Sequence, residues 1–239
     1  MTVGDDGGAR HGAERGTALS VPVWDLWVRL FHWSLAAAVL FQIASGLTGW
    51  QFLDWHRTVG EAVLALVLFR LLWGVFGGAN ARLSALVRSP VAALRHLGEL
   101  ARRDVAPERR HNAAGSWAVI ALLALLGVQA LTGMFIADED EFVEGAWYGT
   151  LGGELSDLLY RVHRVNAELL QALVVLHVAM IVVYLVWARR DLVRPMLTGR
   201  MRWPTDVPLP PLALQRRWVG LPLAALALGA VGLAAGWFG

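Results

Sequence analysis

The chain has 239 residues, of which 56% are hydrophobic, and it contains 12 tryptophans and no cysteine. A mean hydropathy of +0.50 is too high for an ordinary soluble domain and indicates an integral membrane protein. The lack of cysteine excludes disulfides, iron–sulfur clusters, thiolate zinc sites and covalently attached c-type haem. All 21 basic residues are arginines. In a membrane protein their placement matters more than the basic pI, so we expect no nucleic-acid partner.

Residues 1–20 are rich in glycine and charge and lack the basic-then-apolar order of a secretory signal, so we expect a disordered cytoplasmic tail. Apolar segments of about 20 residues, long enough to span a membrane, then occur at residues 28–48, 56–77, 115–136, 163–187 and 218–238. The sequence ALVRSPVAALRHLGELARR, between the second and third segments, predicts a short amphipathic helix on the inner membrane surface. Residues 201–217 are proline-rich and predict an extended cytoplasmic linker.

Charge is distributed unevenly over the connecting segments. Residues 78–114 carry seven arginines and three acidic residues, whereas residues 137–161 carry seven acidic residues and one arginine. The segment 188–217 is basic again. Because short cytoplasmic loops retain an excess of arginine and lysine, we expect the N-terminus and both basic segments in the cytoplasm. The acidic loop and the C-terminus then lie on the outer side.

Two internal repeats suggest duplicated helix hairpins. FQIASGLTGW in the first span resembles VQALTGMFI in the third span. HRTVGEAVLALVLFRLLW, from His56, aligns with HRVNAELLQALVVLHVAM, from His163, and in this alignment Arg70 takes the place of His177.

Four of the seven histidines lie in or at the ends of the predicted spans. Ionisable groups in a membrane usually face the interior of a bundle and have a partner there. The predicted topology places His32 and His177 on the inner side and His56 and His163 on the outer side, so that each pair joins two helices. The other three histidines, His11, His96 and His111, fall in polar, arginine-rich stretches, where we expect solvated side chains.

Two imidazoles that face each other across a helix bundle have the ligation geometry of bis-histidine haem, which passes electrons but has no open site for oxygen chemistry. A zinc ion held by only two histidines would lack ligands. The alternative is a multi-pass transporter with a polar pathway lined by histidine and arginine. Haem propionates need cationic partners. The candidate partners are Arg29, Arg57, Arg70 and Arg164, and Gly46 and Gly60 offer flat surfaces for a macrocycle.

Three further features allow more than one interpretation. Tryptophans near the span ends predict interfacial belts, formed by Trp24, Trp27, Trp33, Trp50, Trp55 and Trp147. The acidic residues Asp138, Glu139, Asp140, Glu141 and Glu144 form either a docking surface for a basic partner or a topological signal only. A GxxxG step at Gly232 and Gly236 suggests that the fifth span packs closely against its own bundle, a second copy or a partner subunit.

The sequences VWDLWVRLFHW, DWHRTVGE and HRVNAELLQALVVLHV resemble the bacterial cytochrome b561 family, which is similar to the b-type cytochrome subunits of nickel–iron hydrogenases. The resemblance covers about residues 21–200 and implies an all-α integral membrane protein of the bacterial inner membrane, and the charge distribution then places the C-terminus in the periplasm. The resemblance implies a four-helix transmembrane bundle that holds two b haems. The fifth helix, at 218–239, departs from the family and lies outside this core. The implied iron ligands are His32, His56, His163 and His177.

The resemblance also implies a function. Such a protein transfers electrons between the quinone pool, as ubiquinone or menaquinone, and a redox partner. That partner is a periplasmic c-type cytochrome, a hydrogenase or a small redox species. The chain would then be an electron-transfer protein or a component of a quinone oxidoreductase.

Overall fold

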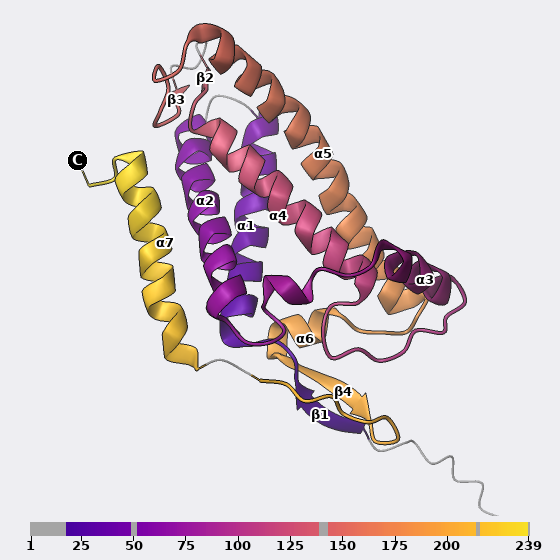
Figure 1. The fold of residues 1–239 in the computed structure, drawn as a ribbon. Coiled ribbons are helices and arrows are strands. Elements are labelled where there is room, and N and C mark those ends of the chain that lie inside the picture. The colour runs from indigo at the N-terminus through magenta and orange to yellow at the C-terminus, as the bar shows by residue number, and fades with distance from the viewer. Residues whose placement is uncertain (1–17, 49–51, 139–142, 214–215, 239) are drawn as a thin grey trace, which may run out of the picture.

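The computed structural model describes residues 18–48, 52–138, 143–213 and 216–238. Five of its helices are long and apolar enough to cross a membrane, and each coincides with one predicted span. They are α1 (Leu26–Thr48), α2 (Leu53–Phe76), α4 (Ala113–Gly133), α5 (Gly153–Val186) and α7 (Gly220–Ala235). The mostly helical architecture is that of an all-α membrane protein (Figure 1).

Helix α2 lies at the centre of the packing. It packs against α1, α4 and α7, and α4 packs in turn against α5 (Figure 1). Within the described residues, α1 and α5 make few contacts with each other. The bundle is therefore built as a chain of neighbouring helices, α7–α2–α4–α5 with α1 beside α2, and it leaves the facing sides of α1 and α5 largely without helix partners.

Two apolar clusters hold these helices together, and α2 contributes to both. One cluster surrounds the fully buried Trp73 and includes Val28 and Phe31 of α1 and Ala227 of α7. The other joins α1, α2, α4 and α5 through Val39, Val63, Val67, Leu126, Ala130 and Leu170. Each buried side chain of this size contributes about 1.5–3 kcal/mol relative to water, although in lipid the gain comes mainly from packing.

The end of the bundle that carries the arginine-rich residues 77–112 and 187–217, together with residues 18–25, is called the basic end below. It holds the predicted amphipathic helix, α3 (Pro90–Ala101), together with the short helices η2 (Leu83–Ala85), α6 (Val193–Thr198) and η3 (Arg217–Val219). Here the domain boundaries need a correction. Residues 18–22 form a strand, β1 (Ala18–Pro22), that pairs antiparallel with β4 (Arg200–Pro204). The end of the expected tail and the start of the expected linker thus form a two-stranded ribbon. Residues 1–17 of the tail lie outside the described ranges.

The opposite, acidic end differs from the sequence prediction in the length of one helix. Helix α5 begins at Gly153, so residues 153–162, expected in a loop, are its first turns. A short ribbon of β2 (Ala137–Asp138) and β3 (Val143–Glu144) precedes it. Residues 139–142, which hold most of the acidic run, lie outside the described residues.

Helix α7 packs against its own bundle. Gly220 lies against the indole ring of Trp27, where an added Cβ would lie 2.1 Å from Cε2, and Trp27 Nε1 donates a hydrogen bond to the carbonyl of Arg217 (2.6 Å). At the other end Trp237 Nε1 donates to Glu61 Oε2 of α2 (2.6 Å). The expectation that this helix packs closely against its own bundle is confirmed, but Gly236 is not part of the packing face, because it ends the helix in a left-handed conformation with φ of 75°.

Trp237→Phe keeps an aromatic ring at this position but removes the donor to Glu61 Oε2. A hydrogen bond to a charged group contributes about 1.5–3 kcal/mol, and each kcal/mol shifts the Tm of a chain of this size by about 2–4 °C. We therefore expect the variant to lower the Tm by roughly 3–12 °C, measured by circular dichroism in detergent. Trp218→Phe, a control at a side chain that is 62% exposed, should leave the Tm nearly unchanged. Equal losses in the two variants would contradict a role for this bond.

Candidate functional site

The outer pair of histidines comes from two helices. His56 lies in the first turn of α2 and His163 in the first half of α5. The two rings are close enough to interact electrostatically, and both are half-buried. The structure therefore brings together the two residues that the sequence predicts as a pair.

Each outer histidine is held by a hydroxyl group from the preceding membrane helix. Ser45 Oγ lies 2.8 Å from His56 Nδ1, and Thr132 Oγ1 lies 3.0 Å from His163 Nδ1. Both hydroxyls also donate to carbonyls of their own helices, Ser45 to Gln42 and Thr132 to the residues three and four positions before it. Because a hydroxyl has one proton to donate, an oxygen that donates to the carbonyl accepts its second hydrogen bond from the ring Nδ1–H. In this arrangement the lone pair of the imidazole lies on Nε2.

A glycine follows each of these hydroxyl residues and lies against the imidazole ring. A Cβ added at Gly46 would lie 3.5 Å from His56 Cε1, and one added at Gly133 would lie 3.4 Å from His163 Cε1. Ser45–Gly46 and Thr132–Gly133 occupy equivalent positions in the first internal repeat. The duplication suggested by the sequence thus gives two hydroxyl–glycine supports of the same kind.

The inner pair, His32 of α1 and His177 of α5, also interacts electrostatically. His32 stands edge-on to Trp33, with ring centroids 5.0 Å apart. Its Nδ1 is buried without a hydrogen-bond partner among the described residues. Among the described residues, His32 therefore lacks a hydroxyl support of the kind that each outer histidine has.

His111 needs a correction, because the sequence predicts a solvated side chain and the structure places it beside the inner pair. The ring is half-buried, its centroid lies 4.5 Å from that of Trp24, and it interacts with Arg70. Burial, followed by the charges of Arg70, His32, Arg88 and His177, lowers the pKa of His111 to about 4. The sequence did not predict this burial, because His111 follows the charged run PERR and no local pattern shows that the loop folds back onto the bundle.

His96, also predicted to be solvated, is buried on α3. Its Nε2 lies 2.5 Å from Tyr184 Oη of α5, and Asn112 Nδ2 donates to the same hydroxyl at 2.9 Å. The periodicity of α3 holds a signal that could have revealed this, because His96 lies one turn before Leu100, the other buried residue of the helix. His96 thus joins the surface helix to the membrane helix.

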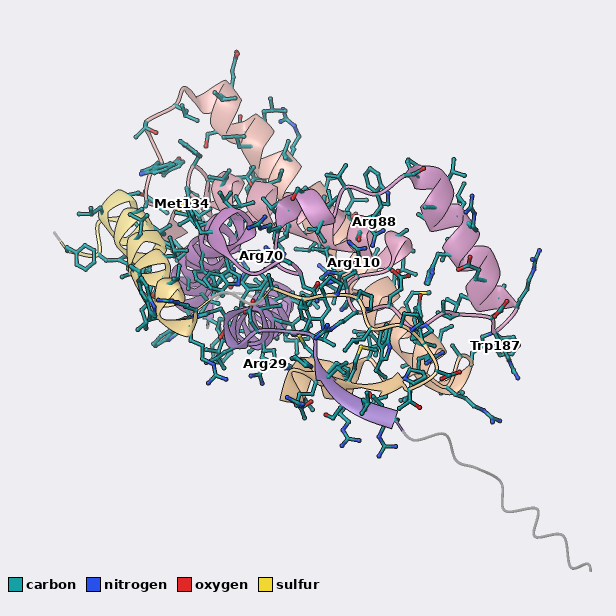
Figure 2. All side chains as sticks on the ribbon, turned by 60° about the horizontal axis from the view of Figure 1, so that its bottom comes forward. Arg29, Arg70, Arg88, Arg110, Met134 and Trp187 are labelled. Atoms are coloured by element: carbon teal, nitrogen blue, oxygen red, sulfur yellow. The ribbon has the colours of Figure 1, made fainter. Side chains whose placement is uncertain are left out.

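The candidate arginines have partners of different kinds. Arg70 is 3% exposed, donates to the carbonyl of Ala81 (2.9 Å) and interacts with Asp25, so its buried charge has an anion within the chain. Arg29 of α1 donates to the carbonyl of Leu197 in α6 (2.7 Å), whereas Arg70 belongs to α2 (Figure 2).

Near the outer pair, Arg57 forms an ion pair with Glu61 (3.1 Å), and its side chain is 41% exposed. Arg164 is exposed and hydrogen-bonded to Tyr160. Gly60 lies against Gln42 of α1, where an added Cβ would come within 3.1 Å of Nε2. The structure therefore places both arginines at the rim of the outer pair and Gly60 at a close approach of α1 to α2.

The tryptophans expected in interfacial belts also connect segments that are distant in sequence. Trp33 Nε1 donates to the carbonyl of Met196 (3.2 Å), and Trp147 Nε1 donates to that of Ala234 (2.8 Å). Trp55 is 63% exposed, and Trp50 lies outside the described residues.

The donor set favours a macrocycle over a bare metal ion. The described part of the chain has no group of three or more histidine, cysteine, aspartate or glutamate side chains that could hold an ion. Haem iron receives four equatorial nitrogens from its porphyrin, so two facing imidazoles complete its coordination. Two pairs of imidazoles, each from two helices, therefore fit haem.

The family model of prokaryotic cytochrome b561 matches residues 23–199, which include all four intramembrane histidines. The chain belongs to the prokaryotic cytochrome b561 family. Membership implies binding of b-type haem and a role in electron transfer. A comparison with curated proteins gave no match. Helix α7 and strand β4 lie beyond the matched residues.

The low pKa of His111 predicts a pH dependence of stability. The folded-state pKa is about 4 and the ordinary value is 6.5, so between these values the unfolded chain binds more protons than the folded one. The contribution of the neutral ring is complete above about pH 6.5 and is lost as the pH falls toward 4. His111→Gln should remove up to about 3 kcal/mol of this dependence, measured as the Tm of wild type and variant across the window. Parallel curves for the two proteins would contradict the assignment.

Proposed function

We propose that this cytochrome holds two b haems, an outer haem ligated by His56 and His163 and an inner haem ligated by His32 and His177. It would carry electrons across the bilayer between the quinone pool and a redox partner. The observation that carries the proposal is the sorting of four imidazoles into two interacting pairs, each contributed by two helices. The facing sides of α1 and α5, which make few helix contacts, supply the room.

The chain's own groups prepare the outer site. The Ser45 and Thr132 hydroxyls hold the Nδ1–H of His56 and His163 and turn Nε2 toward a ligand. Such a bond to the far nitrogen orients a ligating histidine and makes it more basic. Bound haem with two histidine ligands accepts and donates single electrons without an open iron site.

We assign the propionate partners by position. Arg57 and Arg164 follow the outer histidines, and both are exposed, so they can reach an anion at the rim of that site. Arg70 remains the inner candidate because it interacts with His111, which lies beside the inner pair. Its guanidinium already has two partners in the chain, the Asp25 carboxylate and the Ala81 carbonyl. Arg29, bonded to Leu197, is the weaker inner candidate.

We propose the orientation in which the basic end lies in the cytoplasm of a bacterial inner membrane. The acidic end then faces the periplasm, where Glu144, Glu154 and Asp157 are exposed around the start of α5. These side chains lie on the His163 side of the bundle and would attract a basic partner such as a c-type cytochrome. A hydrogenase or a small redox species is the other partner class. Family membership favours this function over a haem-free transporter.

The first test is the haem content of the purified protein. We expect two b haems per chain in a pyridine haemochrome assay and low-spin spectra for both. His177→Ala should remove the inner haem. The reduced spectrum of the outer haem should stay intact, because its proposed ligands, His56 and His163, are unchanged in this variant. One haem or none per wild-type chain would overturn the proposal, and none would favour the transporter.

The second test concerns the hydroxyl supports. Ser45→Ala removes the acceptor for His56 Nδ1–H, so the ligand becomes less basic and stabilises ferric iron less. We expect the midpoint potential of the outer haem to rise by up to about 60 mV, the equivalent of a hydrogen bond of about 1.4 kcal/mol. Thr132→Ala should act in the same direction through His163.

Thr48→Ala is the matched control, since within the described residues the Thr48 hydroxyl bonds only to the carbonyl of Ala44 in the same helix (2.8 Å). Redox titration followed by visible spectroscopy should show no change for this variant. If Ser45→Ala and Thr132→Ala also leave both potentials unchanged, the hydroxyls do not support iron ligands.

A further inference from the structure

A cavity of about 720 Å³ lies at the basic end of the molecule, apart from the four intramembrane histidines. Its walls come from β1, the loop before α4, the end of α5, α6 and β4. Figure 2 turns this end toward the viewer and labels Arg110, one of the lining residues. A cavity of this size suits a small organic ligand.

Arginine dominates the lining. Six arginines contribute, against the two acidic residues Glu108 and Asp191; they are Arg110, Arg189, Arg190, Arg194, Arg200 and Arg202. Asp191 is already engaged, because its Oδ1 accepts hydrogen bonds from the backbone N–H groups of Val193 and Arg194, at 2.9 and 3.0 Å. Burial raises the pKa of Glu108, so this carboxyl is also a weakened counter-charge.

The hydrogen bonds of these arginines go to neutral groups. Arg190 Nη2 donates to the carbonyl of Val105 (3.0 Å), and Arg200 donates through Nε and Nη2 to the hydroxyl and carbonyl of Ser20 (3.0 and 2.6 Å). None of the six forms a salt bridge within the described residues. The positive-inside rule accounts for arginine at this end, but it does not account for six around one cavity that holds only two carboxylates among the described residues.

Arg189 adds an independent observation. Its φ is 53°, the left-handed conformation in which a helix commonly ends with glycine. A side chain at such a position costs conformational free energy that glycine would avoid. The chain nevertheless places an exposed guanidinium there, at the wall of the cavity. Unfavourable backbone conformations of this kind persist where the surroundings or a function require them.

We propose that this cavity binds a phosphate-bearing ligand. Guanidinium groups bind phosphate oxygens through paired, charge-assisted hydrogen bonds, and the arginines around the cavity, none of which forms a salt bridge in the described part of the chain, supply them. A bare phosphate would fill only part of the space, so the phosphate belongs to a larger molecule. Two sources share this chemistry: the headgroup of an anionic phospholipid from the adjacent leaflet, or a soluble phosphate compound.

The test uses the full-length, haem-loaded protein in nanodiscs. In one arm the lipid is phosphatidylcholine with a minor fraction of phosphatidylglycerol, and the phosphatidylglycerol that remains bound is counted by native mass spectrometry. In the other arm the lipid is phosphatidylcholine alone, and binding of inorganic pyrophosphate is measured by calorimetry. The cavity variant is Arg194→Gln/Arg202→Gln. The control, Arg95→Gln/Arg102→Gln, removes two exposed arginines at the same end that do not line the cavity.

We expect the cavity variant to bind one of the two probes at least about tenfold more weakly than wild type, and the control to bind it within about twofold. Loss in the first arm identifies a lipid headgroup, and loss in the second identifies a soluble phosphate compound. If neither probe distinguishes wild type from the cavity variant, or if the control loses as much, the proposal is wrong. Unchanged visible spectra separate this result from any failure of haem binding.

A second variant excludes misfolding as the cause. Arg189→Gly removes a lining charge and relieves the left-handed strain, so it should raise the Tm by about 2–4 °C. It should weaken binding of the same probe severalfold. A stabilised variant with undiminished binding would show that Arg189 has no part in the site.

Discussion

A polar group inside a bilayer has no water to pair with, and this constraint determines how the helices of this chain are joined. Backbone groups satisfy it by forming helices, but buried polar side chains must find partners on neighbouring helices. Asn166 of α5 donates to the side-chain oxygen of Gln129 and to the carbonyl of Leu125, both on α4, at 2.6 and 2.9 Å. Ser45 and Thr132 do the same for the two outer histidines. Polar pairs therefore fix the register of helices that the apolar clusters alone would leave free to slide.

The same constraint separates the two histidine sites. An outer ring whose Nδ1–H is already bonded has one free lone pair, at Nε2, and its rotation is restricted before any ligand arrives. His32, by contrast, keeps a buried Nδ1 without a described partner, and His111 adds a neutral ring close by. We therefore expect that a bound ligand is needed to fix the orientation of the inner histidine rings, whereas the outer rings are oriented before a ligand binds.

The sequence predicted the features that repeat or that follow from hydropathy, and it missed those that depend on long-range folding. All five spans and α3 were correct, because length and periodicity are local signals. The pairing of β1 with β4 joins segments some 180 residues apart, which no local pattern reveals. His96 and His111 were misassigned because a charged neighbourhood suggests solvent, whereas burial depends on which helix the loop meets. The packing of the fifth span was correct, but Gly236 lies past the end of the helix, and spacing alone does not show where a helix ends.

The site prediction had similar limits. The histidine pairs followed from spacing and topology, and the structure brings the members of each pair into electrostatic range. The anionic partner of Arg70 could not be foreseen, since Asp25 precedes α1 and reaches Arg70 only when α1 and α2 pack. Asp25 also accepts from the N–H of Val28 (2.9 Å) and from Trp73 Nε1 (3.2 Å), so one carboxylate caps α1, binds α2 and balances a buried charge.

Helix α7 lies beyond the residues that match the family, yet it is connected to the outer histidine by a continuous set of contacts. Trp237 donates to one oxygen of Glu61, and the other oxygen holds Arg57, the residue next to His56. Glu61 is 5% exposed, so its charge needs both partners. If Trp237 is absent, Glu61 depends on Arg57 alone, and Arg57 is less available to an anion at the rim of the outer site. The added helix therefore does more than fill space, because it shares the carboxylate that determines where Arg57 points.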